Sequence, residues 1–208
     1  KYLFSKGGAE RHFFALQQLL ERRGHEVIVF AMEHPQNVPS PYAGYFASRT
    51  DFEHVRFSWN GLRAAARMIW SFEAARKIDA LIRATRPDIA HIHNIYHQIS
   101  PSILPVLKKH GIPVVMTAHD FHLISPNYNL FHDGAICERC KPTRYYRAIF
   151  HRCIKHSLVA SMIAATAQYL HRWLNVYRKN ISACISPSKF LLQTMHEWNT
   201  RFAREYIL

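Results

Sequence analysis

Polar side chains that can bind or move protons follow three apolar runs of this sequence, at the points where buried strands would end. A histidine at such a point can donate a hydrogen bond to a substrate hydroxyl, or act as an acid or base near neutral pH. A neighbouring aspartate can hold the tautomer of that histidine or bind a hydroxyl itself. Alternatively, these side chains have no functional role and are polar only because loops at strand ends are usually polar. The sequence does not decide between the two interpretations. The residues concerned are His119 and Asp120, His93 and Asn94, and Ser188.

A glycine pair near the start of the chain offers a second kind of chemistry. Gly7 and Gly8 allow a tight turn, and a helical apolar pattern follows them at once. A glycine turn that opens a helix presents free N–H groups and a positive dipole end, which suits a phosphate. The NAD-binding pattern is excluded because the third spaced glycine and the later strand-end acid are missing. Such a turn normally follows a buried strand, and residues 1–6 are too short and polar to be one, so we expect the chain to begin after its first strand.

Three cysteines and a histidine have a spacing that is typical of tetrahedral zinc sites. Cys137 and Cys140 form one short-spaced pair, and Cys153 and His156 form another. Reduced thiols without a metal explain the same pattern, and the sequence does not decide between the two. We interpret His91 as a core residue, although it shares a side of its strand with His93.

Apolar periodicity predicts strands and helices in alternation along the whole chain. Helices are expected over residues 9–23, 60–85, 101–110 and 189–198, with a basic helical region over 144–178 that is broken once. Strands are expected over residues 25–31, 89–93, 113–118 and 181–185, with a short strand over 54–57 inside the loop 33–58. Residues 121–143 are expected to be irregular.

This alternation predicts a Rossmann-like α/β fold, a parallel sheet with helices on both faces, within one domain over residues 1–208. Ligands bind such sheets beyond the carboxyl ends of the strands, which is where the candidate side chains stand.

The charge distribution bears on the choice of partners. The net charge is +13, and no acidic residue occurs between Glu138 and Glu197. Such a field attracts phosphates, nucleic acid or an anionic membrane, and it also fits a solvated surface balanced by another part of the protein. No nucleic-acid motif accompanies the charge. Residues 156–171 contain no Lys, Arg, Asp or Glu, and this stretch is shorter than the ~20 apolar residues that a spanning helix needs.

Five stretches, in this order and spacing, resemble the amino-terminal domain of the retaining glycosyltransferases of family 4, which have the two-domain GT-B fold. They are the glycine turn at residues 7–11, the helix-to-strand turn at 23–27, the strands with their exits at 87–94 and 113–120, and the strand exit at 186–190. The resemblance runs over nearly the whole chain.

The resemblance implies a division of labour between two domains. The carboxyl-terminal domain, which is absent here, would bind most of the nucleotide-sugar donor, and this domain would bind most of a saccharide or lipid-linked acceptor. Gly7 and Gly8 would lie near the donor phosphates, and His119 would be the catalytic residue that reaches the transferred sugar. His93, Asn94, Asp120 and Ser188 are the expected substrate-binding residues. The reaction would retain the anomeric configuration and use neither a metal nor a cofactor.

The resemblance also implies a cytoplasmic protein, peripheral at the inner face of the membrane, that is inactive without its second domain. Some relatives carry a cysteine where this chain has Ser125, which gives them four cysteines with those that match Cys137, Cys140 and Cys153. The serine weakens the zinc interpretation unless His156 replaces the missing cysteine as the fourth ligand. The rival hypothesis is a non-catalytic basic module that binds nucleic acid or an anionic membrane.

Overall fold

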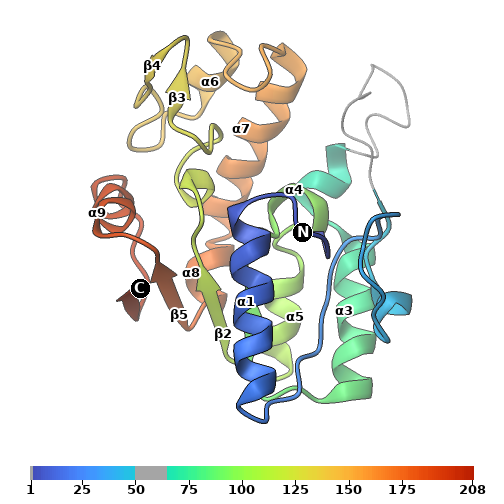
Figure 1. The fold of residues 1–208 in the computed structure, drawn as a ribbon. Helices are drawn as coiled ribbons and strands as arrows, with labels where there is room; N and C mark the ends of the chain where they lie inside the picture. The colour runs from blue at the N-terminus through green and yellow to red at the C-terminus, as the bar shows by residue number, and fades with distance from the viewer. Residues whose placement is uncertain (1, 50–64) are drawn as a thin grey trace. The chain divides into compact units, whose positions relative to one another are not determined.

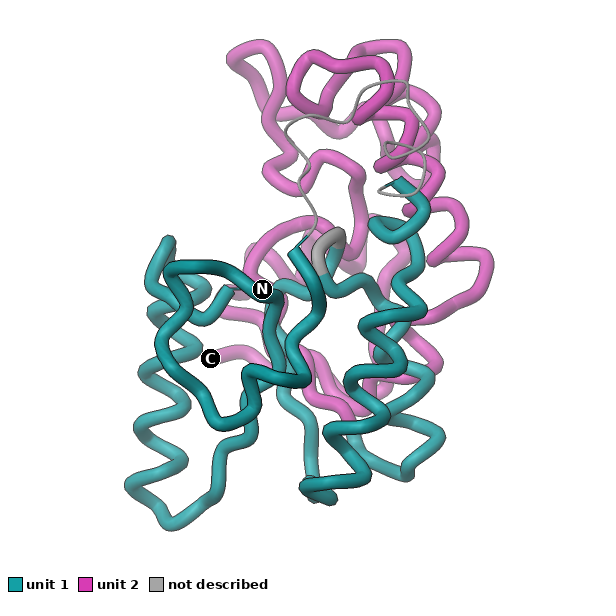
Figure 2. Tube along the Cα trace, turned by 90° about the vertical axis from the view of Figure 1, so that its right-hand side faces the viewer, with its two compact units in different colours: residues 1–113 teal, residues 114–208 magenta. Residues whose placement is uncertain are grey.

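The computed structural model describes residues 2–49 and 65–208. The chain divides into two compact units, Lys1–Pro113 and Val114–Leu208, coloured separately in Figure 2. The short strand expected over residues 54–57 and the beginning of the helix expected over 60–85 lie outside the described residues.

Unit 1 begins with the helix that the glycine turn predicts. Helix α1 spans Gly8–Arg22, and Gly7 stands in the N-cap position with an extended backbone. Glu10 in the first turn and Arg22 in the last turn complement the helix dipole. The chain leaves the helix at Gly24, whose φ of 84° is readily adopted only by glycine.

The long helix expected over residues 60–85 is interrupted before its middle. Residues 65–69 are helical, and helix α3 then starts afresh over Phe72–Thr85 with Ser71 as its N-cap. The break has a local cause, because the backbone of Ser71 bonds outside the helix. Its N–H donates to the Ser100 hydroxyl at 2.9 Å, and its carbonyl accepts from the Ser102 hydroxyl at 2.7 Å. Sequence periodicity does not report these serine contacts.

The remaining elements of unit 1 are short. They are the 3-10 helix η1 (Ala43–Tyr45), strand β1 (Ala90–Ile92) and helices α4 (Tyr96–Ile99) and α5 (Ile103–Lys109). Helix α5 packs against α3. A small core of Leu3, Val29, Ala31 and Phe46 lies beside it, with Phe13 and Phe14 of α1 against its edge.

The strand expected over residues 25–31 does not form. The segment runs as an unpaired chain, drawn as plain coil in Figure 1. The nearest pairing is an isolated bridge between Met32 and Ala47. A strand needs a neighbour to bond with, and an apolar run alone does not supply one.

Unit 2 carries a parallel sheet with strands in the order β2-β5-β6. The strands are β2 (Val114–Thr117), β5 (Ala183–Ser186) and β6 (Glu205–Ile207). Residues Val115 and Thr117 are in register with Ala183 and Ile185, and β5 pairs in parallel with β6 in turn. Strands β2 and β5 are mostly buried, as parallel strands covered by helices should be. The predicted α/β fold class is therefore confirmed.

Helices connect and flank these strands. The connection from β2 to β5 contains α6 (Tyr146–Phe150), α7 (Leu158–Trp173) and α8 (Val176–Asn180), so the basic region is broken twice rather than once. Helix α9 (Lys189–Glu197) joins β5 to β6 and completes a β-α-β unit.

The segment expected to be irregular, residues 121–143, holds two small elements. They are the 3-10 helix η2 (Phe121–Leu123) and the antiparallel pair β3 (Phe131–His132) and β4 (Ala135–Ile136). The hairpin turn uses Asp133 and Gly134, both with positive φ, which aspartate tolerates better than most residues. Each strand has only two residues, too few for an alternating pattern to be visible.

Candidate functional site

In unit 1, the amino-terminal turn of α1 has the donors that an anion needs. The first helical bond runs from the Arg11 N–H to the Gly7 carbonyl at 3.1 Å. In the described chain, no hydrogen bond engages the N–H groups of Gly8, Ala9 or Glu10. These N–H groups and the dipole favour a phosphate, while the carboxylate of Glu10 in the same turn opposes it.

The two glycines leave room at this turn. A Cβ built on Gly8 would meet no atom within 4 Å, and one on Gly7 would stand 3.5 Å from the Glu10 carboxylate, an ordinary contact. Neither glycine has a positive φ. The described packing therefore does not demand glycine here, and the turn is open to close approach by another molecule.

His93 follows β1 and packs among aromatic rings of the same unit. Its ring stacks on His91 with centroids 4.7 Å apart, and it meets the edges of His12 and Phe13 at 5.6 and 5.7 Å. Burial, and then the charge of His12, lower the pKa of His91, so that ring stays neutral at physiological pH. This packing fixes the orientation of His93 at the end of the strand.

Asn94 offers an unused acceptor beside that ring. Its side-chain Oδ1 is buried and has no hydrogen-bond partner in the described chain. A buried acceptor in this state is unfavourable by about 1–3 kcal/mol until a donor reaches it. Asn94 and His93 line the same cavity as Ala9 and Glu10 of α1. Two of the predicted sites in unit 1, the glycine turn and the end of β1, are thus neighbours.

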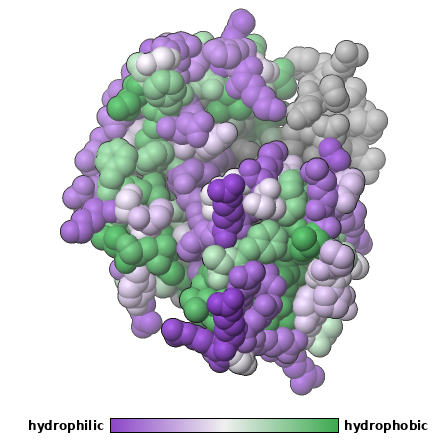
Figure 3. All heavy atoms as spheres, in the orientation of Figure 1, coloured by the Kyte–Doolittle hydropathy of each residue, from purple (hydrophilic) through white to green (hydrophobic). Residues whose placement is uncertain are grey.

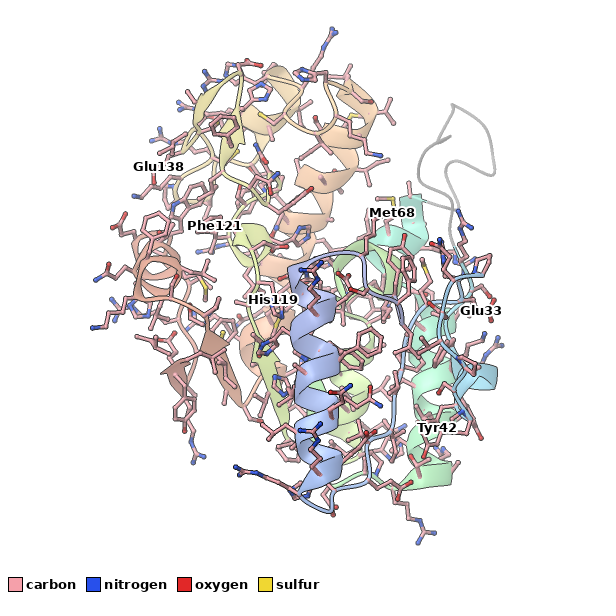
Figure 4. All side chains as sticks on the ribbon, viewed as in Figure 1. Glu33, Tyr42, Met68, His119, Phe121 and Glu138 are labelled. Atoms are coloured by element: carbon pink, nitrogen blue, oxygen red, sulfur yellow. The ribbon has the colours of Figure 1, made fainter. Side chains whose placement is uncertain are left out.

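In unit 2, His119 stands where the sequence places it, just beyond the end of β2 (Figure 4), and Asp120 follows it in the chain. The Ala118 N–H continues the ladder to the Ile185 carbonyl at 2.9 Å, so the strand is held up to the residue before His119. The carboxylate of Asp120 accepts from the His122 N–H at 2.9 Å and caps η2. Burial, and then the charge of Asp120, raise the pKa of Tyr177.

Ser188 stands at the end of the neighbouring strand β5 and has a structural duty. Its hydroxyl caps α9 by accepting from the Leu191 N–H at 3.2 Å. Parallel pairing of β2 and β5 puts both strand ends at one edge, and the rings of Phe121 and Phe190 meet there at 6.2 Å, nearly perpendicular. The Phe190 side chain is 69% exposed. The edge of the sheet where β2 and β5 end therefore carries the polar residues His119, Asp120 and Ser188 together with aromatic side chains.

One residue that positions this edge was not predicted from the sequence. The buried side chain of Gln168, on α7, donates to the carbonyls of His122 and Ser125, the latter at 3.2 Å. It ties the loop after His119 to the longest helix of the unit. A glutamine among apolar residues was the only signal available.

The described structure does not support a formed zinc site at the cysteines and histidine with zinc-like spacing. Burial, and then the charges of Cys153 and Cys137, raise the pKa of Cys140 to about 12, and similar causes raise that of Cys153 to about 11. Within residues 2–49 and 65–208, no group of three or more His, Cys, Asp or Glu side chains is arranged to hold a metal ion.

The surface of α6 and α7 combines exposed aromatic and aliphatic side chains with bases. Phe150 and Trp173 are 78% and 80% exposed, and Leu158 and Met162 are also exposed. Figure 3 shows hydrophobic residues among hydrophilic ones over this part of unit 2, at the top of the view. None of the described helices is long and apolar enough to cross a membrane.

Comparison with known proteins decides the family. The model of Glycosyltransferase Family 4 matches residues 6–204. The chain belongs to glycosyltransferase family 4. The match includes the glycine turn, both strand exits with histidine and the cap of α9.

A curated relative is more distant. An uncharacterized 42.6 kDa protein in the cps region of Klebsiella pneumoniae is 26% identical over 143 residues, which is 64% of this chain and 38% of that protein. The chain therefore matches well under half the length of this relative. No solved structure matches the chain significantly.

Proposed function

We propose that this family 4 chain is the acceptor-side part of a retaining glycosyltransferase, which moves a sugar from a nucleotide-sugar to a saccharide or lipid-linked acceptor. The observation that carries the proposal is the family match over residues 6–204. The polar groups at the ends of parallel strands support it, since ligands bind α/β sheets at that edge.

His119 is the proposed catalytic residue. Its imidazole would donate a hydrogen bond to a hydroxyl of the transferred sugar, a bond that strengthens as charge develops at the reacting carbon. Asp120 is committed to the cap of η2 through the His122 N–H. That cap holds the backbone just after His119, so Asp120 would position the histidine beside the substrate that both residues are proposed to contact.

The α1 turn is the proposed contact for the donor phosphates. The unengaged N–H groups of residues 8–10 and the absence of side chains at Gly7 and Gly8 support this role. Asn94 would accept from a substrate hydroxyl through its buried Oδ1. No cofactor and no metal take part in the proposal, because the nucleotide-sugar is itself the activated substrate.

The α6–α7 surface supports a peripheral place at the inner face of the membrane. Arg147 and Arg152 lie close in the sequence to the exposed Phe150 and Leu158, and bases among apolar side chains suit anionic lipid headgroups. A lipid-linked acceptor would then be met at the surface where it resides.

Sugar transfer by the complete protein and by residues 1–208 alone tests the proposal. The complete protein should transfer label from a nucleoside diphosphate sugar to a lipid-linked saccharide, and the 208-residue chain should not. Robust turnover by the short chain would contradict the division of labour. Tight duplex binding with a steep salt slope, and no transfer by the complete protein, would favour the rival basic module.

A further inference from the structure

An exposed aromatic pair lies at the edge of unit 2 where β2 and β5 end. The ring of Phe190, at the start of α9, meets the ring of Phe121 in η2 at 6.2 Å, with the two planes at 87°. Phe190 is 69% exposed, so this contact leaves most of its ring open to solvent. Phe121 comes two residues after His119, and Figure 4 labels both side chains just beyond β2. The open ring therefore borders the candidate polar residues of this unit.

Neither the core nor the start of α9 requires an aromatic ring at position 190. The buried side chains of this helix are Leu191, Thr194 and Met195. Phe190 lies in the first turn, where an acidic side chain would favour the helix dipole and a phenyl ring does not. Such a ring gains free energy when it leaves water. A molecule that covers Phe190 would therefore bind with that gain.

Hydrogen bonds to the backbone hold both halves of the pair in place. The Ser188 hydroxyl caps α9 two residues before Phe190, and the Phe190 carbonyl accepts from the Thr194 hydroxyl at 2.8 Å. In the other half, the Phe121 N–H donates to the Tyr128 carbonyl at 3.0 Å and closes the loop that η2 begins. A surface whose backbone is already fixed loses less freedom when a ligand binds. The pair is thus a prepared surface.

The groups around the open ring favour a ligand with one apolar face and a polar rim. His119, Asp120 and Ser188 stand at the ends of the same two strands, so polar side chains border the aromatic face. A hydrocarbon chain on this edge would take those side chains out of water without bonding to them, which is unfavourable. A pyranose ring has C–H groups on one face, which fit the negative face of an aromatic ring, and hydroxyls around its rim, which can bond to imidazole and carboxylate.

We propose that Phe190 is the stacking platform for a pyranose unit of the acceptor, and that Phe121 positions it. The identification of this sugar as the acceptor rests on the proposed function, whereas stacking itself is a binding property that needs no sugar transfer to be measured. The proposal narrows the substrate class, because the part of the acceptor that meets this edge is a sugar ring and not a lipid chain.

Saturation-transfer NMR on the complete protein tests the proposal. The probes are the methyl pyranosides of glucose, galactose and mannose, with uridine as a planar ligand for comparison. Phe190→Leu keeps an apolar side chain and removes the aromatic face, whereas Phe190→Tyr keeps the ring. Phe150→Leu is the matched control, because it removes another highly exposed ring of unit 2, 78% exposed, from α6.

At least one pyranoside should receive saturation from aromatic protons of the protein, mainly at the C–H groups of one face of the sugar. Phe190→Leu should weaken its binding about 3- to 10-fold, which is the usual range for one aromatic contact. Phe190→Tyr and Phe150→Leu should bind it as the unaltered protein does. Because both altered side chains are exposed, circular dichroism should show an unchanged fold in every variant.

No binding of any pyranoside, or equal binding by Phe190→Leu and the unaltered protein, would overturn the proposal. Saturation transfer to uridine alone would overturn it too, because the ring would then stack on a nucleobase. Sugar transfer with an acceptor KM that Phe190→Leu leaves unchanged would contradict the platform and leave the proposed transferase standing. Pyranoside binding that depends on Phe190, in a complete protein that transfers no sugar, would support the stacking site and contradict the transferase.

Discussion

At the scale of single residues, the candidate side chains at the strand ends of the two units have different roles. The side chains of Asp120 and Ser188 accept the hydrogen bonds that cap η2 and α9. Asn94 keeps a buried acceptor without a partner. The sequence located all of these residues at strand ends, because an apolar run followed by polar residues marks such an end. The sequence did not show which of these side chains cap a helix and which are left to bind a ligand, because capping depends on which backbone N–H groups lie within reach of the side chain.

Asn94 gives a prediction about binding. In the complete enzyme, Asn94→Ala should lower kcat/KM by about 3- to 10-fold, the equivalent of one hydrogen bond, because a substrate hydroxyl loses its acceptor. Thermal stability should not fall, since the Oδ1 atom bonds nothing in the described chain. Steady-state kinetics with the exposed Asn129→Ala as control measure this. Unchanged kinetics would remove Asn94 from the site.

Gln168 gives a prediction about positioning. Gln168→Leu should reduce the free energy of unfolding by about 1–3 kcal/mol, because the carbonyls of His122 and Ser125 lose their buried donor. Gln168→Glu keeps the size and loses the amide donor, so it should be destabilised as well. Urea unfolding measures both. A fully stable Gln168→Leu variant would show that this link does not hold the loop.

At the scale of elements, the sequence predicted the long amphipathic helices and the buried strands of unit 2 well. Helices α1 and α9 and strands β2 and β5 lie within one or two residues of their expected positions. The failures have physical causes outside the local pattern. The helix over residues 60–85 is interrupted by serine contacts at Ser71, and residues 25–31 lack a partner strand. Strands β3, β4 and β6 have two or three residues each, too few for a periodic signal.

The cap of α9 gives a prediction at this scale. Ser188→Ala should destabilise unit 2 by about 1 kcal/mol, because the Leu191 N–H loses its acceptor. Ser188→Gly should cost only a few tenths of a kcal/mol, since glycine is a tolerated N-cap. Thermal unfolding distinguishes the two. Equal losses would mean that Ser188 acts through something other than the cap.

The contact between α3 and α5 gives a prediction about pH. Hydrogen bonds from Arg83 first, and then from His110, lower the pKa of Asp79 from 3.8 to about 2. A carboxylate whose pKa is lower in the folded state stabilises the fold above its unfolded pKa. This stabilisation should therefore be complete above about pH 4 and lost as the pH falls toward 2. The urea midpoints of the protein and of Asp79→Asn should converge over this range.

A second variant checks the cause. Arg83→Gln removes the first partner of Asp79, so the pKa of Asp79 in the folded state should rise toward its unfolded value. The acid-sensitive stabilisation should then be smaller, and its loss should be complete at a higher pH than in the unaltered protein. Midpoints of the protein and Asp79→Asn that differ by a constant amount from pH 5 to pH 2 would contradict the assignment.

At the scale of the whole molecule, the net charge and the fold are both compatible with the proposed glycosyltransferase function. A net charge of +13 is compatible with the proposed phosphate-bearing donor and with the proposed contact with an anionic surface. The α/β fold and the family were both foreseen from the order and spacing of short motifs, because each motif marks a strand exit or a helix start.

The most direct test of the account is sugar transfer by the complete enzyme carrying His119→Ala. The exposed His25→Ala is the control for histidine loss, and circular dichroism verifies the fold. We predict that kcat falls by about 10²–10³-fold in His119→Ala, which is the usual loss when a hydrogen-bond donor to charge in the transition state is removed. The His25→Ala enzyme should transfer sugar normally. An unchanged kcat in a folded His119→Ala enzyme would contradict the catalytic role assigned to this strand end.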